Sequence, residues 1–183
     1  AADVWCVVAG GVSWRFHPTG AGVQAEYRVN DSATKVICAE DNAQIDKILS
    51  GRAPCPSLQK IIVFDMEGLS GFIDPMVLSL AEFIALGRNH AQGNEALWDT
   101  MVGSRGADDL AILVYTSGTT GPAKGAMHSN RGVTHQMRHA NDLFPSTHAE
   151  APLVFLPPCP VPGRARAHTL PLARVSCWPR PAT

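Results

Sequence analysis

The sequence predicts an α/β protein with a mostly parallel sheet flanked by helices. Short runs rich in apolar and β-branched residues recur at residues 34–39, 60–64 and 109–115, as expected of buried strands. Segments with helical spacing or helix-capping residues lie between these runs, and alternating strands and helices build a largely parallel sheet. The chain has 183 residues, 45% of them hydrophobic, which is enough for one domain with a core.

The first expected helix covers residues 41–49. Ile45 and Ile48 lie at helical spacing, and Asp41 stands where its carboxylate can accept a hydrogen bond from the first turn. The strand expected at residues 60–64 reads KIIVF and follows a connection rich in Gly and Pro. Strand, helix and strand in this order are typical of a parallel crossover unit.

Further helices are expected between the second and third strands. Ser79 and Glu82 have the spacing of a capping box, in which each side chain satisfies an amide at a helix start. This helix is predicted to stop at Gly87, and another is predicted over residues 94–101.

The third strand, residues 109–115, reads DLAILVY and is the strongest of the three. A polar loop rich in Gly follows it. A helix is then expected over residues 131–143, with Ser129 or Asn130 as its cap. From Pro157 onward proline is so frequent that we expect no regular element there.

Composition narrows the function classes. The formal net charge is −1, which argues against nucleic acid as a partner, because binding to phosphate backbones needs a clustered basic surface. The five cysteines show no Cys-x-x-Cys spacing, so neither a zinc site nor a disulfide framework is indicated. No apolar run is long enough to span a bilayer, and no secretory signal is recognisable, so we expect a cytoplasmic chain.

The loop after the third strand carries the chemistry. Residues 115–125 read YTSGTTGPAKG. Its glycines let backbone amides approach an anion closely, its hydroxyls supply donors, and its lysine supplies a positive charge suited to phosphate. We therefore predict a cradle for a polyphosphate. The glycines are Gly118, Gly121 and Gly125, the hydroxyl residues are Thr116, Ser117, Thr119 and Thr120, and the lysine is Lys124.

Three other interpretations of this loop are less consistent with the residues. A flexible linker rarely follows an apolar strand or ends in a single placed lysine. A Walker phosphate loop needs Ser or Thr directly after its lysine, whereas Gly125 follows Lys124 here. A hydrolase elbow needs Gly-x-Ser-x-Gly, which is absent.

The loop at residues 115–125 resembles the phosphate-binding signature of the superfamily of acyl- and aryl-CoA synthetases, luciferases and peptide-synthetase adenylation domains. Other stretches resemble the long-chain fatty acyl-CoA synthetase branch. These stretches are residues 4–13, 27–32, 39–41 with 44–49, and 125–127. The resemblance implies that residues 1–157 are part of the N-terminal adenylation domain. Residues 158–183 are then expected to be an irregular tail, frame-shifted or truncated.

In that family the fatty acid carboxylate attacks the α-phosphate of ATP, with Mg2+ bound, and coenzyme A then displaces AMP. The resemblance implies catalytic roles for Lys124 and Thr116, and it places Thr116 near Mg2+. It also implies that seven residues hold the β- and γ-phosphates. These are Thr116, Ser117, Gly118, Thr119, Thr120, Gly121 and Lys124.

Several family segments have no counterpart in this sequence. They are the glutamate segment that holds the metal, the ribose-binding segment, the hinge and the small C-terminal domain. The sequence also begins without Met, so we expect a piece of a longer protein that does not adenylate alone. Two alternatives stay open: an aryl-CoA or medium-chain ligase or amino-acid adenylation domain, or a truncated product that keeps only nucleotide contact. Peripheral association with a membrane and the oligomeric state also stay open.

Two histidines share one face of the last expected helix. His135 and His139 lie four residues apart, which is a spacing that metal sites use. Gln136 stands where a His-Glu-x-x-His site has its glutamate. We therefore expect exposed helix histidines and no metalloprotease site.

Overall fold

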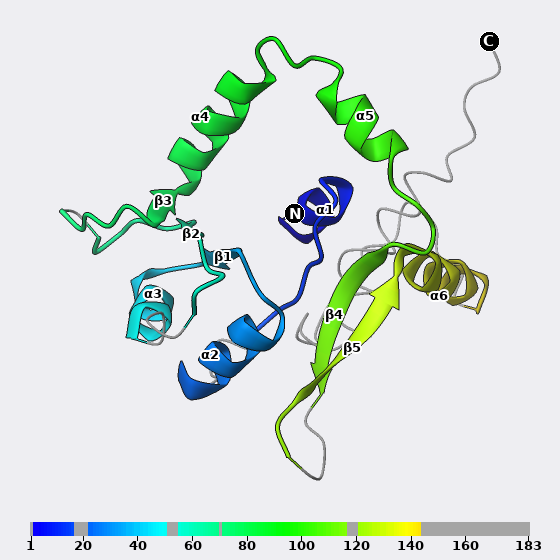
Figure 1. Ribbon diagram of the computed structural model, residues 1–183, viewed down its shortest axis with the longest axis horizontal. Helices are drawn as coiled ribbons and strands as arrows, with labels where there is room; N and C mark the ends of the chain where they lie inside the picture. The colour runs from blue at the N-terminus through cyan, green and yellow to red at the C-terminus, as the bar shows by residue number, and fades with distance from the viewer. Residues whose placement is uncertain (1, 17–21, 51–54, 70, 117–120, 144–183) are drawn as a thin grey trace. The chain divides into compact units, whose positions relative to one another are not determined.

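A computed structural model describes most of the chain before residue 144 (Figure 1). The described ranges are residues 2–16, 22–50, 55–69, 71–116 and 121–143. They fall into two compact units. We call Phe16–Thr100 the sheet unit, and Ala1–Arg15 together with Met101–Thr183 the hairpin unit.

The sheet unit contains a three-stranded parallel sheet. Its strands are β1 (Val36–Ala39), β2 (Lys60–Val63) and β3 (Val77–Ser79), in the order β1-β2-β3. Ile37 pairs with Ile61 between β1 and β2, so the two strongest apolar runs of this region lie side by side. The parallel α/β architecture expected from the sequence is confirmed, although β3 was not expected as a strand.

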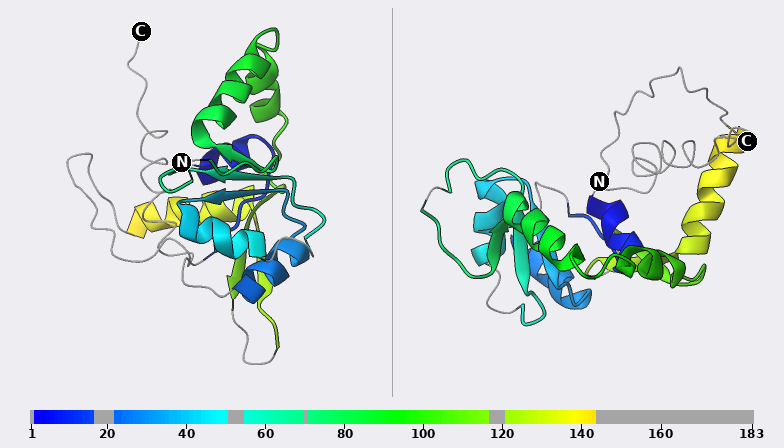
Figure 2. Two further views of the ribbon diagram at one scale, coloured as in Figure 1. Left: turned by 90° about the vertical axis from the view of Figure 1, so that its left-hand side faces the viewer. Right: turned by 90° about the horizontal axis from the view of Figure 1, so that it is seen from above.

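Helices cover both faces of this sheet. The sheet unit holds α2 (Gly22–Asp31), α3 (Asn42–Ser50) and α4 (Leu80–Ala91), and α5 (Leu97–Gly103) leads on to the hairpin unit. Figure 2 shows α3 and α4 on opposite faces of the sheet. The alternation of strand and helix in the sequence therefore produces the expected layered packing.

The helix starts follow the capping residues that the sequence supplies. The Gln44 amide donates to the Asp41 carboxylate at 3.0 Å, which caps α3. At α4 the Ser79 hydroxyl accepts from the Glu82 amide at 3.2 Å, and the Glu82 carboxylate accepts from the Ser79 amide at 2.8 Å. The predicted stop at Gly87 is wrong, because α4 continues to Ala91. A single glycine weakens a helix by only about 1 kcal/mol and does not end it.

The apolar core of the described residues lies mainly in the sheet unit. Ile45 of α3 and Ile61 and Val63 of β2 are fully buried. Ala111 is the one buried apolar residue that the described part of the hairpin unit contributes. The strand at residues 110–116 is therefore half-buried here, whereas the sequence predicted a buried one.

The hairpin unit is built on two antiparallel strands. It contains α1 (Ala2–Val8), β4 (Leu110–Thr116), β5 (Lys124–Ser129) and α6 (Asn130–Leu143). β5 was not expected from the sequence, and β4 pairs with it antiparallel. The polar loop therefore closes a hairpin and does not lead from a parallel strand straight into a helix.

The other side of β4 pairs with the chain that follows α1. The Ser13 amide donates to the Ala111 carbonyl, and the Leu113 amide donates to the Ser13 carbonyl, both at 3.0 Å. Asp3 of α1 accepts from the buried Ser13 hydroxyl at 2.6 Å and forms an ion pair with Arg15. These bonds join α1 to β4. They also satisfy the Ser13 side chain, which is the one buried polar residue among those described.

Candidate functional site

The hairpin brings the two ends of the polar loop together. Thr116, the last residue of β4, pairs with Lys124, the first residue of β5. Directly opposite residues of an antiparallel pair project their side chains to the same face, about 4.5–5.5 Å apart at Cβ. Both residues are exposed. A hydroxyl and an ammonium group therefore leave the same face of the hairpin at the base of the loop.

The described end of the loop contains a left-handed turn at Gly121. Its φ is +92°, a backbone conformation that L side chains rarely adopt. An added Cβ there would meet no atom of the described residues within 4 Å. The backbone conformation by itself therefore favours glycine at this position. An anion-binding nest needs a left-handed residue of this kind beside a right-handed one.

The Tyr115 ring packs against the strand that follows the loop. Tyr115 lies opposite Gly125 in the β4–β5 register. A Cβ at Gly125 would lie 3.3 Å from the Tyr115 ring, so glycine leaves room for the ring to lie close to the opposite strand. Trp14 meets Tyr115 edge to face, with ring centroids 5.5 Å apart. The aromatic pair stiffens the strand next to Thr116, and such pairs add about 0.5–1.5 kcal/mol beyond burial.

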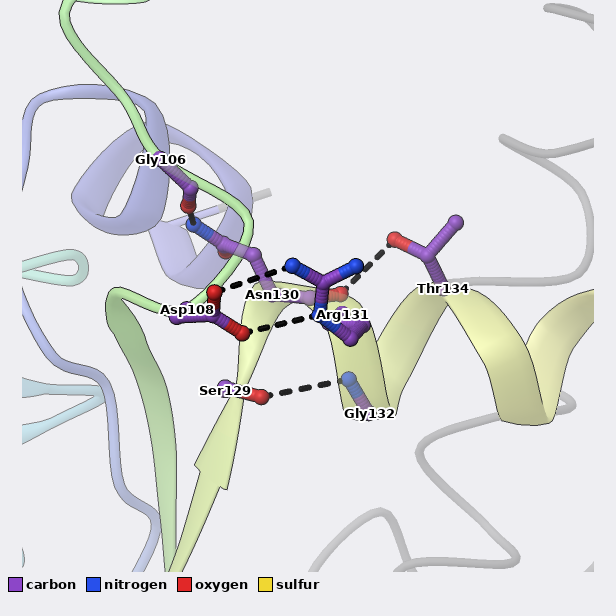
Figure 3. A network of polar contacts seen from close by, with 7 residues as sticks. All are labelled: Gly106, Asp108, Ser129, Asn130, Arg131, Gly132 and Thr134. Atoms are coloured by element: carbon purple, nitrogen blue, oxygen red, sulfur yellow. Dashed lines mark hydrogen bonds and ion pairs between the residues drawn. The ribbon is translucent and has the colours of Figure 1, made fainter.

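The far end of the hairpin is fastened to the start of α6 (Figure 3). The Ser129 hydroxyl accepts from the Gly132 amide at 3.2 Å, so Ser129 is the N-cap that the sequence offered. The Asn130 side-chain amide donates to the Gly106 carbonyl at 2.9 Å and ties α6 to the turn before β4. The start of β4 and the end of β5 therefore meet in one polar network.

An exposed ion pair completes this network. The Arg131 guanidinium donates two hydrogen bonds to the Asp108 carboxylate, at 2.8 and 2.9 Å (Figure 3). These hydrogen bonds and the guanidinium charge lower the pKa of Asp108. The same hydrogen bonds and the carboxylate charge raise the pKa of Arg131. Nothing in the sequence predicts this pair, because Asp108 and Arg131 are 23 positions apart.

The structure describes three of the seven residues expected to hold phosphate. It brings Thr116 and Lys124 together and places Gly121 between them in the chain. The other four, Ser117, Gly118, Thr119 and Thr120, lie outside the described residues. Tyr115 and Trp14 were not expected as supporting residues. Their only signal in the sequence is an aromatic residue directly before the loop.

The potential metal ligands of the described ranges are dispersed. Within them, no group of three or more His, Cys, Asp or Glu side chains is arranged to hold a metal ion. Thr116 offers one hydroxyl oxygen, which suits a hard cation such as Mg2+. His135 and His139 are exposed on α6, with ring centroids 4.1 Å apart.

The fold and the loop agree with the protein family whose sequence pattern this chain matches. Residues 2–173 match the family described as AMP-binding enzyme. The chain belongs to the AMP-binding enzyme family. Two curated relatives are long-chain-fatty-acid–CoA ligases. ACSBG1 of Macaca fascicularis is 29% identical over 158 residues, and ACSBG2 of Xenopus laevis is 30% identical over 151 residues.

This AMP-binding enzyme chain spans about a fifth of those relatives. The match to ACSBG1 covers 84% of this chain and 21% of that protein, and the match to ACSBG2 covers 78% and 20%. Among solved structures, ATP-bound MatB from Rhodopseudomonas palustris is similar, with a TM-score of 0.64 and 21% identity. That match covers 93% of this chain and 30% of MatB, so the chain has the fold of part of MatB.

The described helices are shorter and less apolar than a bilayer crossing requires. None of the helices in the described ranges has the length and apolar content that a membrane span requires. The longest, α6, has 14 residues, whereas a span needs about 20.

Proposed function

We propose that this chain is part of a long-chain fatty acid–CoA ligase and that residues 116–124 bind the triphosphate of ATP. The family match supports the adenylate-forming chemistry. The curated relatives support the choice of a long-chain fatty acid, since the matches to ACSBG1 and ACSBG2 each cover more than three quarters of this chain.

The observation that carries the proposal is the pairing of Thr116 with Lys124 across the hairpin. It holds a hydroxyl donor and an ammonium group on one face, at the two ends of the loop. The left-handed backbone at Gly121 turns the chain between them. The proposed phosphate site also includes the residues whose placement is not described, which are Ser117, Gly118, Thr119 and Thr120.

The chemistry is stabilisation of a leaving group. When the fatty acid carboxylate attacks the α-phosphate, the bond to pyrophosphate breaks and negative charge grows on the β- and γ-phosphates. The Lys124 ammonium and the hydroxyl and amide donors of the loop would offset that charge. Thr116 would provide a hydroxyl ligand for Mg2+, which neutralises triphosphate charge when bound. Coenzyme A would then take the acyl group from the adenylate.

The proposal also covers the domain boundaries and the class of acid that is activated. We assign residues 1–157 to the adenylation domain and residues 158–183 to an irregular tail. An aryl-CoA or medium-chain ligase or an amino-acid adenylation domain would use the same loop with another acid. A chain that binds ATP without adenylating is the further alternative. The identity to long-chain ligases favours the first assignment.

Calorimetric titration of the chain with ATP and Mg2+ tests the phosphate site. Lys124→Ala should raise the Kd for ATP by about tenfold or more, because a hydrogen bond to a charged group contributes about 1.5–3 kcal/mol. Lys35→Ala removes an exposed lysine from the sheet unit and should leave the Kd unchanged. Equal Kd values for wild type and Lys124→Ala would refute the assignment of the loop.

Exchange of labelled pyrophosphate into ATP tests the reaction. Exchange that depends on a long-chain fatty acid, and not on an aryl acid, a medium-chain acid or an amino acid, would support the proposed ligase. ATP binding without exchange under any acid would identify a chain that keeps only nucleotide contact.

A further inference from the structure

We propose that His135 and His139 form a binding site for a divalent transition-metal ion on the exposed face of α6. The two residues are four positions apart in a helix of 14 residues, so their side chains are neighbours on one face. Both are exposed, and their ring centroids lie 4.1 Å apart. The pair lies on a different element from Thr116 and Lys124, which belong to β4 and β5.

A hydrogen bond fixes the tautomer of one ring. His139 Nδ1 lies 3.0 Å from the His135 backbone carbonyl. A carbonyl oxygen can only accept, so Nδ1 carries the proton and donates it. The lone pair of the neutral ring is therefore on Nε2, which is the atom that binds metal. Metal-binding histidines in proteins are commonly oriented by this kind of bond from the second ring nitrogen.

The ring separation suits chelation of one ion. Metal–imidazole bonds are about 2.0–2.1 Å long, so two nitrogens on one ion lie about 3 Å apart. The two ring centroids are 4.1 Å apart and the ring planes are tilted by 40°, so the imidazoles are already neighbours. Rotation about their side-chain bonds would bring one nitrogen of each ring onto the same ion.

The ligand types decide which ions bind. Imidazole suits Zn2+, Ni2+ and Cu2+, and affinity rises from Ni2+ to Cu2+, whereas Mg2+ prefers oxygen ligands. Within the described ranges no third His, Cys, Asp or Glu side chain joins the pair in a metal-binding group. Water would fill the remaining positions, so the site stays open to a further ligand.

Nearby positive charge is partly neutralised. Arg131 lies one turn before His135 on the same helix face, and its guanidinium is bound to the Asp108 carboxylate. Arg138 is exposed and lies about a quarter-turn from His139 around the helix axis. The ion pair therefore lowers the repulsion that Arg131 would otherwise exert on a bound cation.

Calorimetric titration of the chain with Ni2+ tests the site, and a matched variant isolates the pair. The double variant Gln136→His with His139→Gln keeps the same numbers of His and Gln but places the histidines at adjacent positions, which do not face each other on a helix. We expect its Kd for Ni2+ to be about tenfold higher or more than that of wild type. Every variant keeps the same cysteines, so thiol binding contributes equally.

A second measurement localises the ion. Ni2+ is paramagnetic, so it should broaden the amide resonances of α6 around residues 135–139 in wild type and not in the double variant. His128→Gln, which changes a histidine of β5, should behave like wild type in both measurements. An equal Kd for wild type and the double variant, or broadening elsewhere than α6, would overturn the proposal.

Discussion

Replacing Gly121 with Ala tests whether the loop depends on its left-handed turn. A Cβ at this position meets no atom of the described residues within 4 Å, so the expected effect comes from the backbone conformation. Its φ of +92° is unfavourable for every residue that has a Cβ. The substitution therefore isolates one physical term.

The magnitude follows from two opposing effects. A left-handed conformation costs an L residue about 1–2 kcal/mol. Alanine also restricts the unfolded chain more than glycine does, which stabilises the folded state by about 0.4–1 kcal/mol. We expect the free energy of opening of the β4–β5 hairpin to fall by about 1 kcal/mol, which is a fivefold increase in the open population.

Hydrogen exchange of the β4 and β5 amides measures this free energy locally, without requiring that both units unfold together. Gly132→Ala is the matched control in the same unit. Gly132 lies in the first turn of α6, and its added Cβ would be 3.6 Å from the Ser129 hydroxyl, an ordinary contact. Alanine there should stabilise the helix by about 0.5 kcal/mol.

The two variants should therefore change stability in opposite directions. Protection of β4 and β5 that stays constant or rises in Gly121→Ala would refute the argument. It would mean that residue 121 does not hold the left-handed backbone on which the proposed nest relies.

Four further predictions concern the capped helix and the ion pair. Ser79→Ala should lower the stability of α4 by about 1 kcal/mol through loss of its cap, measured by exchange of the helix amides. Hydrogen bonds from Ser79 lower the pKa of Glu82, so this carboxylate stabilises α4 above its ordinary pKa of 4.5, and protection should decline as pH falls below that value. Gly87→Ala should increase protection of α4, because Gly87 lies inside the helix with nothing within 4 Å of an added Cβ. The Asp108 carboxyl should titrate below 3.8 in an NMR titration and move back toward that value in Arg131→Gln; an unchanged pKa would contradict the ion pair.

Elements with a strong local signal were predicted well. The runs that became β1 and β2 are short, apolar and β-branched, and α3 and α4 begin at the capping residues that the sequence shows. These features depend on contacts between residues a few positions apart. Local sequence is therefore sufficient to place them.

Elements that depend on a distant partner were missed. β5 contains Gly125 and no β-branched residue, and it is a strand because β4 pairs with it. β3 has three residues next to a strong helix cap, and its pairing with β2 defines it. Strand pairing is non-local, so periodicity in one segment does not report it.

The candidate site also has features that the local sequence predicts and features that depend on distant residues. The composition of residues 115–125 was enough to predict a phosphate loop, since glycine, hydroxyl and ammonium groups have fixed chemical uses. That Thr116 faces Lys124, and that Tyr115 supports Gly125 from the opposite strand, became visible only through the register of the hairpin.

The sequence alone thus determined the α/β class, the helix starts and the chemical character of the loop, because these follow from side-chain type and spacing along the chain. The tertiary structure alone decided that the loop closes an antiparallel hairpin, that Asp108 meets Arg131, and that His135 and His139 hold their rings together. The residues paired in the hairpin and in the ion pair are far apart in the sequence and become neighbours only when the chain folds. The contact between the two imidazole rings depends on side-chain rotamers, which the spacing of the residues in the sequence does not determine.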